Sequence, residues 1–183
     1  SKGVDTAVEA LQICRRAGYD IELTLAGRID PDNPKALSEA QVRQFEAVPG
    51  VRWCGHVNDI NALWAQHHVA VLPSRGGEGL PKSLIEAAAA GRPVVTTDVP
   101  GCAEFARATG GWIVPSNDPV ALAAAMQDCM AHRDLASTGV AARSVVAERF
   151  TQDHAWEKTW VVYRQLLSYP GVHCRDDNSQ NGF

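Results

Sequence analysis

The sequence lacks a long apolar stretch, a basic cluster and a leader-like start. No apolar run approaches the roughly 20 residues that a helix needs to cross a bilayer, and no basic segment precedes an apolar one as in a signal peptide. Lysines and arginines are scattered and the net charge is -4, which argues against an extended nucleic-acid surface because such a surface needs clustered cations. We therefore expect a cytoplasmic protein that does not bind nucleic acid.

Paired cysteine spacings are also missing. The chain has five cysteines, an odd number, and no two of them have the Cys-x2-Cys spacing of a zinc site. Neither a disulfide framework nor a metal site is indicated. We expect reduced thiols and no bound metal.

Short β-rich runs alternate with longer helical patterns along most of the chain. The patterns predict strands at residues 21–26, 51–54, 69–72, 93–97 and 112–114. They predict helices at residues 4–16, 38–47, 58–66, 84–90, 101–108, 118–130, 136–149 and 151–167. This alternation favours an α/β fold, a doubly wound parallel sheet flanked by helices and Rossmann-like. We expect one lobe over residues 1–167 and a disordered polar tail over 168–183.

One loop has the composition of an anion site. Residues 74–86 read Ser-Arg-Gly-Gly-Glu-Gly-Leu-Pro-Lys-Ser-Leu-Ile-Glu, follow a predicted strand and enter a helix. In a parallel sheet, ligands bind at the carboxyl ends of the strands. The loop glycines would let the backbone bend and approach a ligand, and Pro81 suits a first helical turn. The amides of Lys82 and Ser83 would then point at a diphosphate.

Two carboxylates bracket this predicted helix start. Glu86 lies about one turn into the helix, where it can accept hydrogen bonds from a ribose diol. Glu78 lies before the helix, where it can accept from hydroxyls of a sugar beyond the phosphates. The residues therefore predict a nucleotide-sugar site.

The motifs of this segment closely resemble family 4 of the retaining, two-lobed glycosyltransferases, in the bacterial branch that builds capsule, O-antigen or exopolysaccharide. The core of the resemblance is the Glu-x7-Glu signature, matched by Glu78 and Glu86. Further pieces match in order and are Lys2-Gly3, Gly27, Gly55-His56-Val57, Gly91-Arg92-Pro93, Asp98-Val99-Pro100-Gly101 and Val114-Pro115. The resemblance covers about residues 1–167.

The resemblance implies transfer of a sugar from a UDP-sugar, with retention and without an obligatory metal, to a saccharide or lipid-linked acceptor. It places Glu78 at the donor sugar and Glu86 at the ribose. It implies that the diphosphate is held by Lys2, Gly79, Leu80 and Ser83, and that backbone near Val57 holds the base. Gly27, Arg28, Lys82 and Glu104 complete the candidate donor-binding set. No residue is assigned as catalytic.

The resemblance also implies a partner lobe. An N-terminal lobe with the acceptor contacts is expected outside this sequence, so the isolated lobe is expected to be inactive. That lobe would also mediate any association with the inner membrane face. Three alternatives stay open, namely a nucleotide-sugar epimerase of the same architecture, a non-catalytic α/β binding module, and an oligomer in which a second copy covers an unpaired sheet edge.

Overall fold

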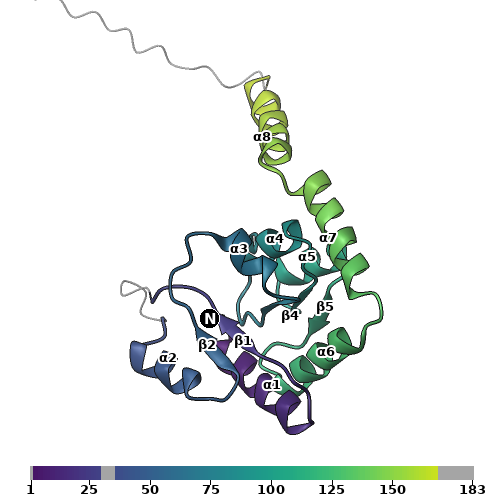
Figure 1. Ribbon diagram of the computed structural model, residues 1–183. Coiled ribbons are helices and arrows are strands. Elements are labelled where there is room, and N and C mark those ends of the chain that lie inside the picture. The colour runs from purple at the N-terminus through teal and green to yellow at the C-terminus, as the bar shows by residue number, and fades with distance from the viewer. Residues whose placement is uncertain (1, 30–35, 169–183) are drawn as a thin grey trace, which may run out of the picture. The chain divides into compact units, whose positions relative to one another are not determined.

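The computed structural model describes residues 2–29 and 36–168 of the chain, which consist of parallel strands and helices (Figure 1). The strands are β1 (Leu23–Leu25), β2 (Val51–Trp53), β3 (Ala70–Leu72), β4 (Val94–Thr97) and β5 (Trp112–Val114). The helices are α1 (Val4–Arg16), α2 (Glu39–Glu46), α3 (Ile60–Ala65), α4 (Lys82–Ala89), α5 (Cys102–Thr109), α6 (Pro119–Ala131), α7 (Leu135–Arg149) and α8 (Gln152–Leu167). The chain divides into a first unit that ends at Ala147 and a second that begins at Glu148.

The strands of the first unit form two parallel sheets. One sheet pairs β1 with β2, and the other has the order β3-β4-β5. In the second sheet Val71 lies opposite Val95, and Thr97 lies opposite Val114. Because all pairs are parallel, the carboxyl ends of the strands in each sheet lie at one edge, where ligands bind in folds of this class.

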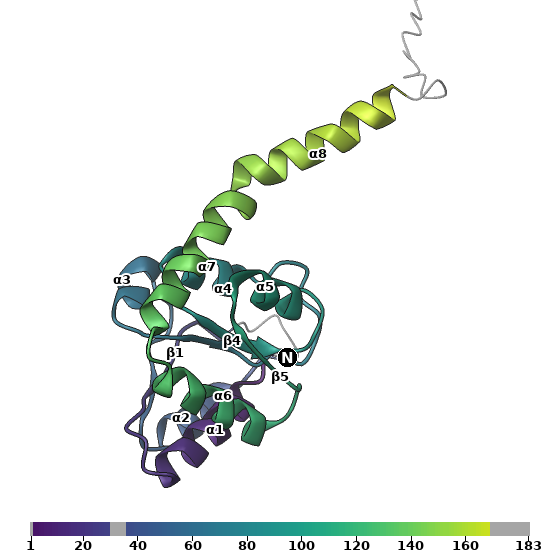
Figure 2. The same ribbon diagram turned by 90° about the vertical axis from the view of Figure 1, so that its right-hand side faces the viewer.

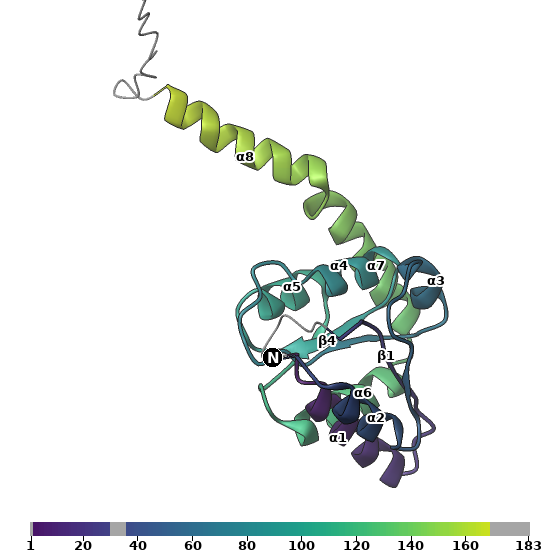
Figure 3. The same ribbon diagram turned by 90° about the vertical axis from the view of Figure 1, so that its left-hand side faces the viewer.

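Helices cover both faces of the strands. Figure 2 and Figure 3 show α3, α4 and α5 on one side and α1, α2 and α6 on the other. This layering confirms the predicted α/β architecture with helices on both faces. It follows from the sequence pattern, because a parallel strand pair needs a crossover helix and right-handed crossovers can run over either face.

Helix α1 packs against both sheets. Ala10 and Cys14 on α1 lie in one cluster with Val95 of β4 and Leu122 of α6. Val8 and Leu11, also on α1, form a second cluster with Val51 of β2. All four residues of β4 are buried, whereas the residues of β1 are only half-buried. The core is therefore deepest at the β3-β4-β5 sheet.

The predicted helix starts agree with the caps in the structure. The side chains of Ser38, Asp59, Asp118 and Thr151 accept hydrogen bonds from the first turns of α2, α3, α6 and α8. Helix α4 begins at Lys82, two residues before the predicted start, and Pro81 is its N-cap rather than a residue of the first turn. The helix starts early because Pro81 O accepts from the amides of Leu84 and Ile85.

The second unit contains α8, in which no residue is buried. Its exposed apolar side chains include Trp156, Trp160 and Tyr163.

The tail predicted to be disordered lies, from residue 169 on, outside the described residues. Within residues 2–29 and 36–168, no helix combines the length and the apolar character needed to cross a membrane. Cys14, Cys54, Cys102 and Cys129 are free thiols, and Cys174 lies outside the described residues.

Candidate functional site

The loop between β3 and α4 is held at two points by close approaches of glycine backbone. Gly3 caps α1 with φ 66°, and a Cβ atom built on it would lie 2.0 Å from the carbonyl oxygen of Pro73. Gly101 has φ +81°, and its Cβ atom would lie 1.7 Å from the carbonyl oxygen of Glu78. The amide of Glu78 also donates to Pro100 O at 2.9 Å. The backbone around Glu78 is therefore fixed by the loop that follows β4.

The glycines inside the loop do not adopt the left-handed backbone that favours glycine. None of Gly76, Gly77 and Gly79 lies in the left-handed region, so the bend does not depend on their freedom. A Cβ atom on Gly76 or Gly79 would meet no atom within 4 Å. The left-handed glycines that shape the loop are Gly3 and Gly101, which lie outside it. The expectation that the loop glycines produce the bend is thus wrong.

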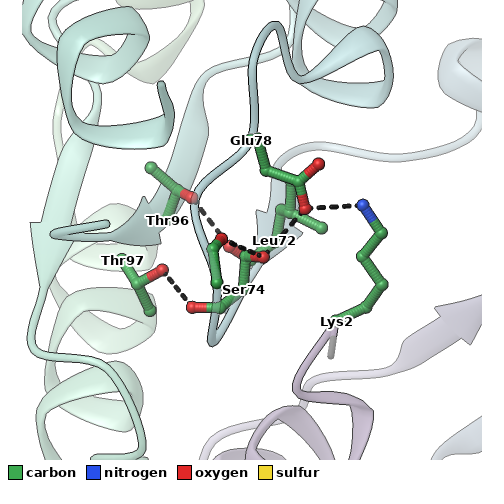
Figure 4. A network of polar contacts seen from close by, with 7 residues as sticks. Lys2, Leu72, Ser74, Glu78, Thr96 and Thr97 are labelled. Carbon is green, nitrogen blue, oxygen red and sulfur yellow. Dashed lines mark hydrogen bonds and ion pairs between the residues drawn. The ribbon is translucent and has the colours of Figure 1, made fainter. Parts of the chain in front are cut away.

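Two side chains hold the carboxylate of Glu78, as Figure 4 shows. Lys2 Nζ lies 2.6 Å from Glu78 Oε1, and Ser74 Oγ donates to the same oxygen at 2.9 Å. Burial raises the pKa of the Glu78 carboxyl, but the hydrogen bonds from Lys2 and Ser74 outweigh it, so the net pKa lies below its ordinary value. The carboxylate is therefore ionised at neutral pH and half-buried beside a cation.

Ser74 lies at the centre of this network. It is only 1% exposed, and its carbonyl oxygen accepts a hydrogen bond of 2.6 Å from Thr97 Oγ1 on β4. Thr96 Oγ1, also on β4, donates to Leu72 O of β3 at 2.7 Å (Figure 4). The end of β3 is thus tied to the end of β4 by threonine hydroxyls as well as by the backbone ladder.

A second ion pair joins the loop to α1. Arg75 Nη2 lies 2.6 Å from Asp5 Oδ2 and donates to Thr6 Oγ1 at 3.0 Å. Burial raises the pKa of the Asp5 carboxyl, but the Arg75 hydrogen bond and backbone amides outweigh it and lower the net pKa. Lys2, Asp5 and Thr6 are close in sequence, so the start of α1 forms one wall of the site.

The N-terminus of α4 is open. Pro81 makes no side-chain cap, and within the described residues no hydrogen bond is recorded from the amides of Lys82 and Ser83. The predicted contact residues here are exposed, and these residues are Gly79, Leu80, Lys82, Ser83 and Glu86. Unpaired amides at a helix start favour an anion through their partial positive charge. The predicted anion site is therefore accessible.

A second group of predicted residues follows the other sheet. The amide of Gly27 donates to Gly55 O at 2.8 Å, and Trp53 Nε1 donates to Gly27 O at 2.9 Å. These bonds place the loops after β1 and β2 side by side. Arg28 is exposed and Val57 is half-buried. No contact recorded among the described residues joins this group to Glu78.

Glu104 has a structural partner. Its carboxylate accepts a hydrogen bond from the amide of Gly101 and so caps α5. Hydrogen bonds from the backbone amides of Glu104 and Gly101 lower the pKa of this carboxyl. A carboxylate engaged at a helix start has less freedom to accept from a ligand, so Glu104 is the candidate that the geometry supports least.

Several residues that shape the site received no role from the sequence. Ser74 was visible only as a small hydroxyl residue directly after a buried strand. The Asp5–Arg75 pair had no local signal, because its two members are 70 residues apart. Within the part of the chain that the structure describes, no group of three or more His, Cys, Asp or Glu residues could hold a metal ion.

The sequence model of a family described as "Glycosyl transferases group 1" matches residues 1–132. WcaL of Salmonella typhimurium, a glycosyltransferase assigned to colanic acid biosynthesis, is 33% identical over 175 residues, which are 91% of this chain and 41% of that protein. The capsular polysaccharide biosynthesis glycosyltransferase CapM of Staphylococcus aureus is 27% identical over 91% of this chain and 43% of its own length. The chain thus spans about two fifths of the length of these relatives.

Solved structures share the fold. A glycosyltransferase from Rickettsia africae superposes with a TM-score of 0.77 at 23% identity. The superposition covers 92% of this chain and 45% of the Rickettsia chain. Anabaena HepE, solved in complex with UDP-glucose, superposes with a TM-score of 0.74 at 20% identity over 91% of this chain and 45% of its own. At these identities the likeness shows the architecture alone.

Proposed function

Since the chain belongs to the group 1 glycosyl transferases, we propose that its first unit binds the nucleotide-sugar donor of a retaining glycosyltransferase. The family match and the relatives in capsule and colanic acid biosynthesis support a role in making a bacterial polysaccharide. The remainder of the protein would supply the second lobe, the contacts to a saccharide or lipid-linked acceptor and any association with a membrane surface.

The observation that carries this proposal is the meeting of Lys2 and Glu78 beside the open start of α4. Their side chains are 2.6 Å apart although the residues are 76 positions apart in sequence. A sugar joined to a diphosphate needs a cation and amides for the phosphates, and an acceptor for the sugar hydroxyls a few ångströms away. Lys2, the amides of Lys82 and Ser83, and the Glu78 carboxylate offer these groups.

The rest of the donor follows along α4 and the second group. Glu86 lies one turn into the helix, where its exposed carboxylate can accept from the ribose hydroxyls. Backbone near Val57 would then contact the base, and Arg28 the outer face of the phosphates. Uridine is the proposed base, because the Glu-x7-Glu resemblance implies it and HepE, whose fold this chain shares, binds UDP-glucose.

In the proposed reaction the bond from the sugar C1 to the diphosphate oxygen breaks, and the electron pair leaves with UDP. The oxygen of an acceptor hydroxyl forms the new bond to C1 on the same face, and its proton passes to the departing diphosphate oxygen, which has gained the electron pair. The helix dipole and Lys2 would stabilise the charge that develops on the leaving diphosphate, which is the kind of task that a bound metal performs elsewhere. No obligatory metal is part of the proposal.

Binding measurements on this chain test the proposal directly. We expect UDP to raise the melting temperature at millimolar concentration, and GDP and ADP to raise it less. Glu86→Gln should weaken UDP binding about ten-fold, because a charged acceptor to the ribose is lost. Glu78→Gln should leave UDP affinity within about two-fold and weaken the UDP-sugars selectively.

Glu9→Gln is the matched control, since Glu9 is exposed on α1 and belongs to no site residue set. It should bind every nucleotide as the unaltered chain does. A chain that binds none of UDP, GDP, ADP, UDP-glucose, UDP-galactose and UDP-N-acetylglucosamine would refute the proposed function. So would a Glu86→Gln variant with unchanged affinity for UDP.

A further inference from the structure

The carboxylate of Glu78 has to be oriented by something other than its own backbone. Its amide and carbonyl are fixed by Pro100 and Gly101, but a glutamate side chain turns about three further bonds. Holding such a side chain in one conformation costs rotamer entropy. A site that binds a sugar tightly gains if this cost is met before the ligand arrives.

Two groups are in position to orient the carboxylate, and they differ in how exposed they are to solvent. Lys2 has a side chain that is 57% exposed and, in the proposed function, it contacts the diphosphate. Ser74 is 1% exposed, and its backbone is held by the 2.6 Å hydrogen bond from Thr97. The backbone of Ser74 is therefore held by contacts that do not involve Lys2.

The hydroxyl of Ser74 has a choice of acceptors. It lies 2.9 Å from Glu78 Oε1 and 3.1 Å from Gly76 O. The carboxylate is the nearer and the charged acceptor, and hydrogen bonds to ionised groups are about twice as strong as neutral ones. Both recorded partners of the carboxylate contact Oε1, and none is recorded on Oε2 among the described residues.

We propose that Ser74 is a positioning residue, which anchors Oε1 of Glu78 so that Oε2 is presented to a hydroxyl of the donor sugar. The role rests on the proposed function, because it needs Glu78 to contact the sugar. Ser74 itself does not touch the donor. It acts on the sugar through Glu78 and leaves the affinity for the nucleotide unchanged.

The test is a double-mutant cycle read as sugar selectivity. Dissociation constants are measured for UDP and for whichever of UDP-glucose, UDP-galactose and UDP-N-acetylglucosamine binds most tightly. Ser74→Ala should weaken the UDP-sugar about five-fold and leave UDP within about two-fold. In the Glu78→Ala background, which leaves no side-chain acceptor for the Ser74 hydroxyl, the same change should have no further effect. The pKa of Glu78, followed by the chemical shift of its carboxyl carbon, should rise in Ser74→Ala.

Two further variants keep the result interpretable. Thr96→Val removes another buried hydroxyl of the same network, one that bonds Leu72 O rather than Glu78, and should not change the ratio of the two dissociation constants. If Ser74→Ala does not fold, Ser74→Cys replaces it, because the thiol fills a similar space but is a weak donor.

Each other result decides against the proposal. Equal weakening of UDP and UDP-sugar by Ser74→Ala would mean that Ser74 only supports the loop. Additive effects of Ser74→Ala and Glu78→Ala would mean that Ser74 acts independently of the carboxylate. An unaltered chain that binds UDP and the UDP-sugars equally would show that Glu78 makes no sugar contact. The absence of any nucleotide binding would refute the proposed function itself, and with it this role.

Discussion

The two sheets hold their loops in different ways. The loop after β3 is tied by one ion pair to Asp5 of α1 and by a second to Lys2, which precedes that helix. It is also tied to β4 by Thr97 and to the next loop by the close approach of Gly101. The loops after β1 and β2 are joined mainly by backbone bonds and by the indole of Trp53. The loop that carries Glu78 is therefore held by more side-chain contacts than the loops proposed to lie at the base.

The largest effect should come from breaking the close approach on the β3 side. Gly101→Ala places a Cβ atom 1.7 Å from the carbonyl oxygen of Glu78, so we expect a loss of at least about 3 kcal/mol in the free energy of unfolding. Gly110 ends the same helix, also with positive φ, but a Cβ atom there meets nothing within 4 Å. Gly110→Ala should cost only about 1–2 kcal/mol.

Urea unfolding of both variants, monitored by circular dichroism, measures the two costs. Similar losses for Gly101→Ala and Gly110→Ala would mean that the loop yields to the added carbon. The β3 side would then be no more rigid than the rest of the chain, and the comparison would fail.

A smaller effect should come from the cores beneath the two sheets. Leu122 is fully buried against the β3-β4-β5 sheet, and Leu122→Ala should cost about 3 kcal/mol. Leu23 of β1 is half-buried beside the other cluster, and Leu23→Ala should cost about 1 kcal/mol because part of its surface is already in water. Urea midpoints that fall equally for the two variants would contradict the difference in depth.

The smallest effect concerns the ion pairs. Arg75→Met removes the partner of Asp5 and should cost up to about 1 kcal/mol at pH 7. Because the folded-state pKa of Asp5 is lowered from 3.8, this contribution is present above that value and is lost as the pH falls below it. Arg43→Met breaks the more exposed pair with Glu39 on α2 and should cost only about 0.3 kcal/mol.

Thermal unfolding at pH 7 and at pH 3 tests both parts of this prediction. The difference between Arg75→Met and the unaltered chain should shrink at pH 3. A difference that is the same at both values would show that Asp5 is not the group through which Arg75 stabilises the loop.

Much of the fold was readable from the residues because its signals are local. The caps at Ser38 and Asp118 depend on residues two or three positions away, and strand–helix alternation indicated the layers. The predicted start of α4 was wrong by two residues, since Pro81 O organises the first turn. The explanation of the loop bend by its own glycines failed because the constraint comes from Gly101, beyond the next strand.

The sequence by itself determined the alternation of strands and helices, the open helix start between Glu78 and Glu86, and the resemblance built on their spacing. Each depends on neighbours within one or two turns, where backbone geometry and side-chain chemistry decide the outcome. Only the tertiary structure decided that Lys2 and Ser74 share one oxygen of Glu78, and that Asp5 holds Arg75. The contacts of Lys2 and Asp5 arise because the start of α1 lies beside the residues that follow β3, and no local pattern encodes a contact between segments some 70 residues apart.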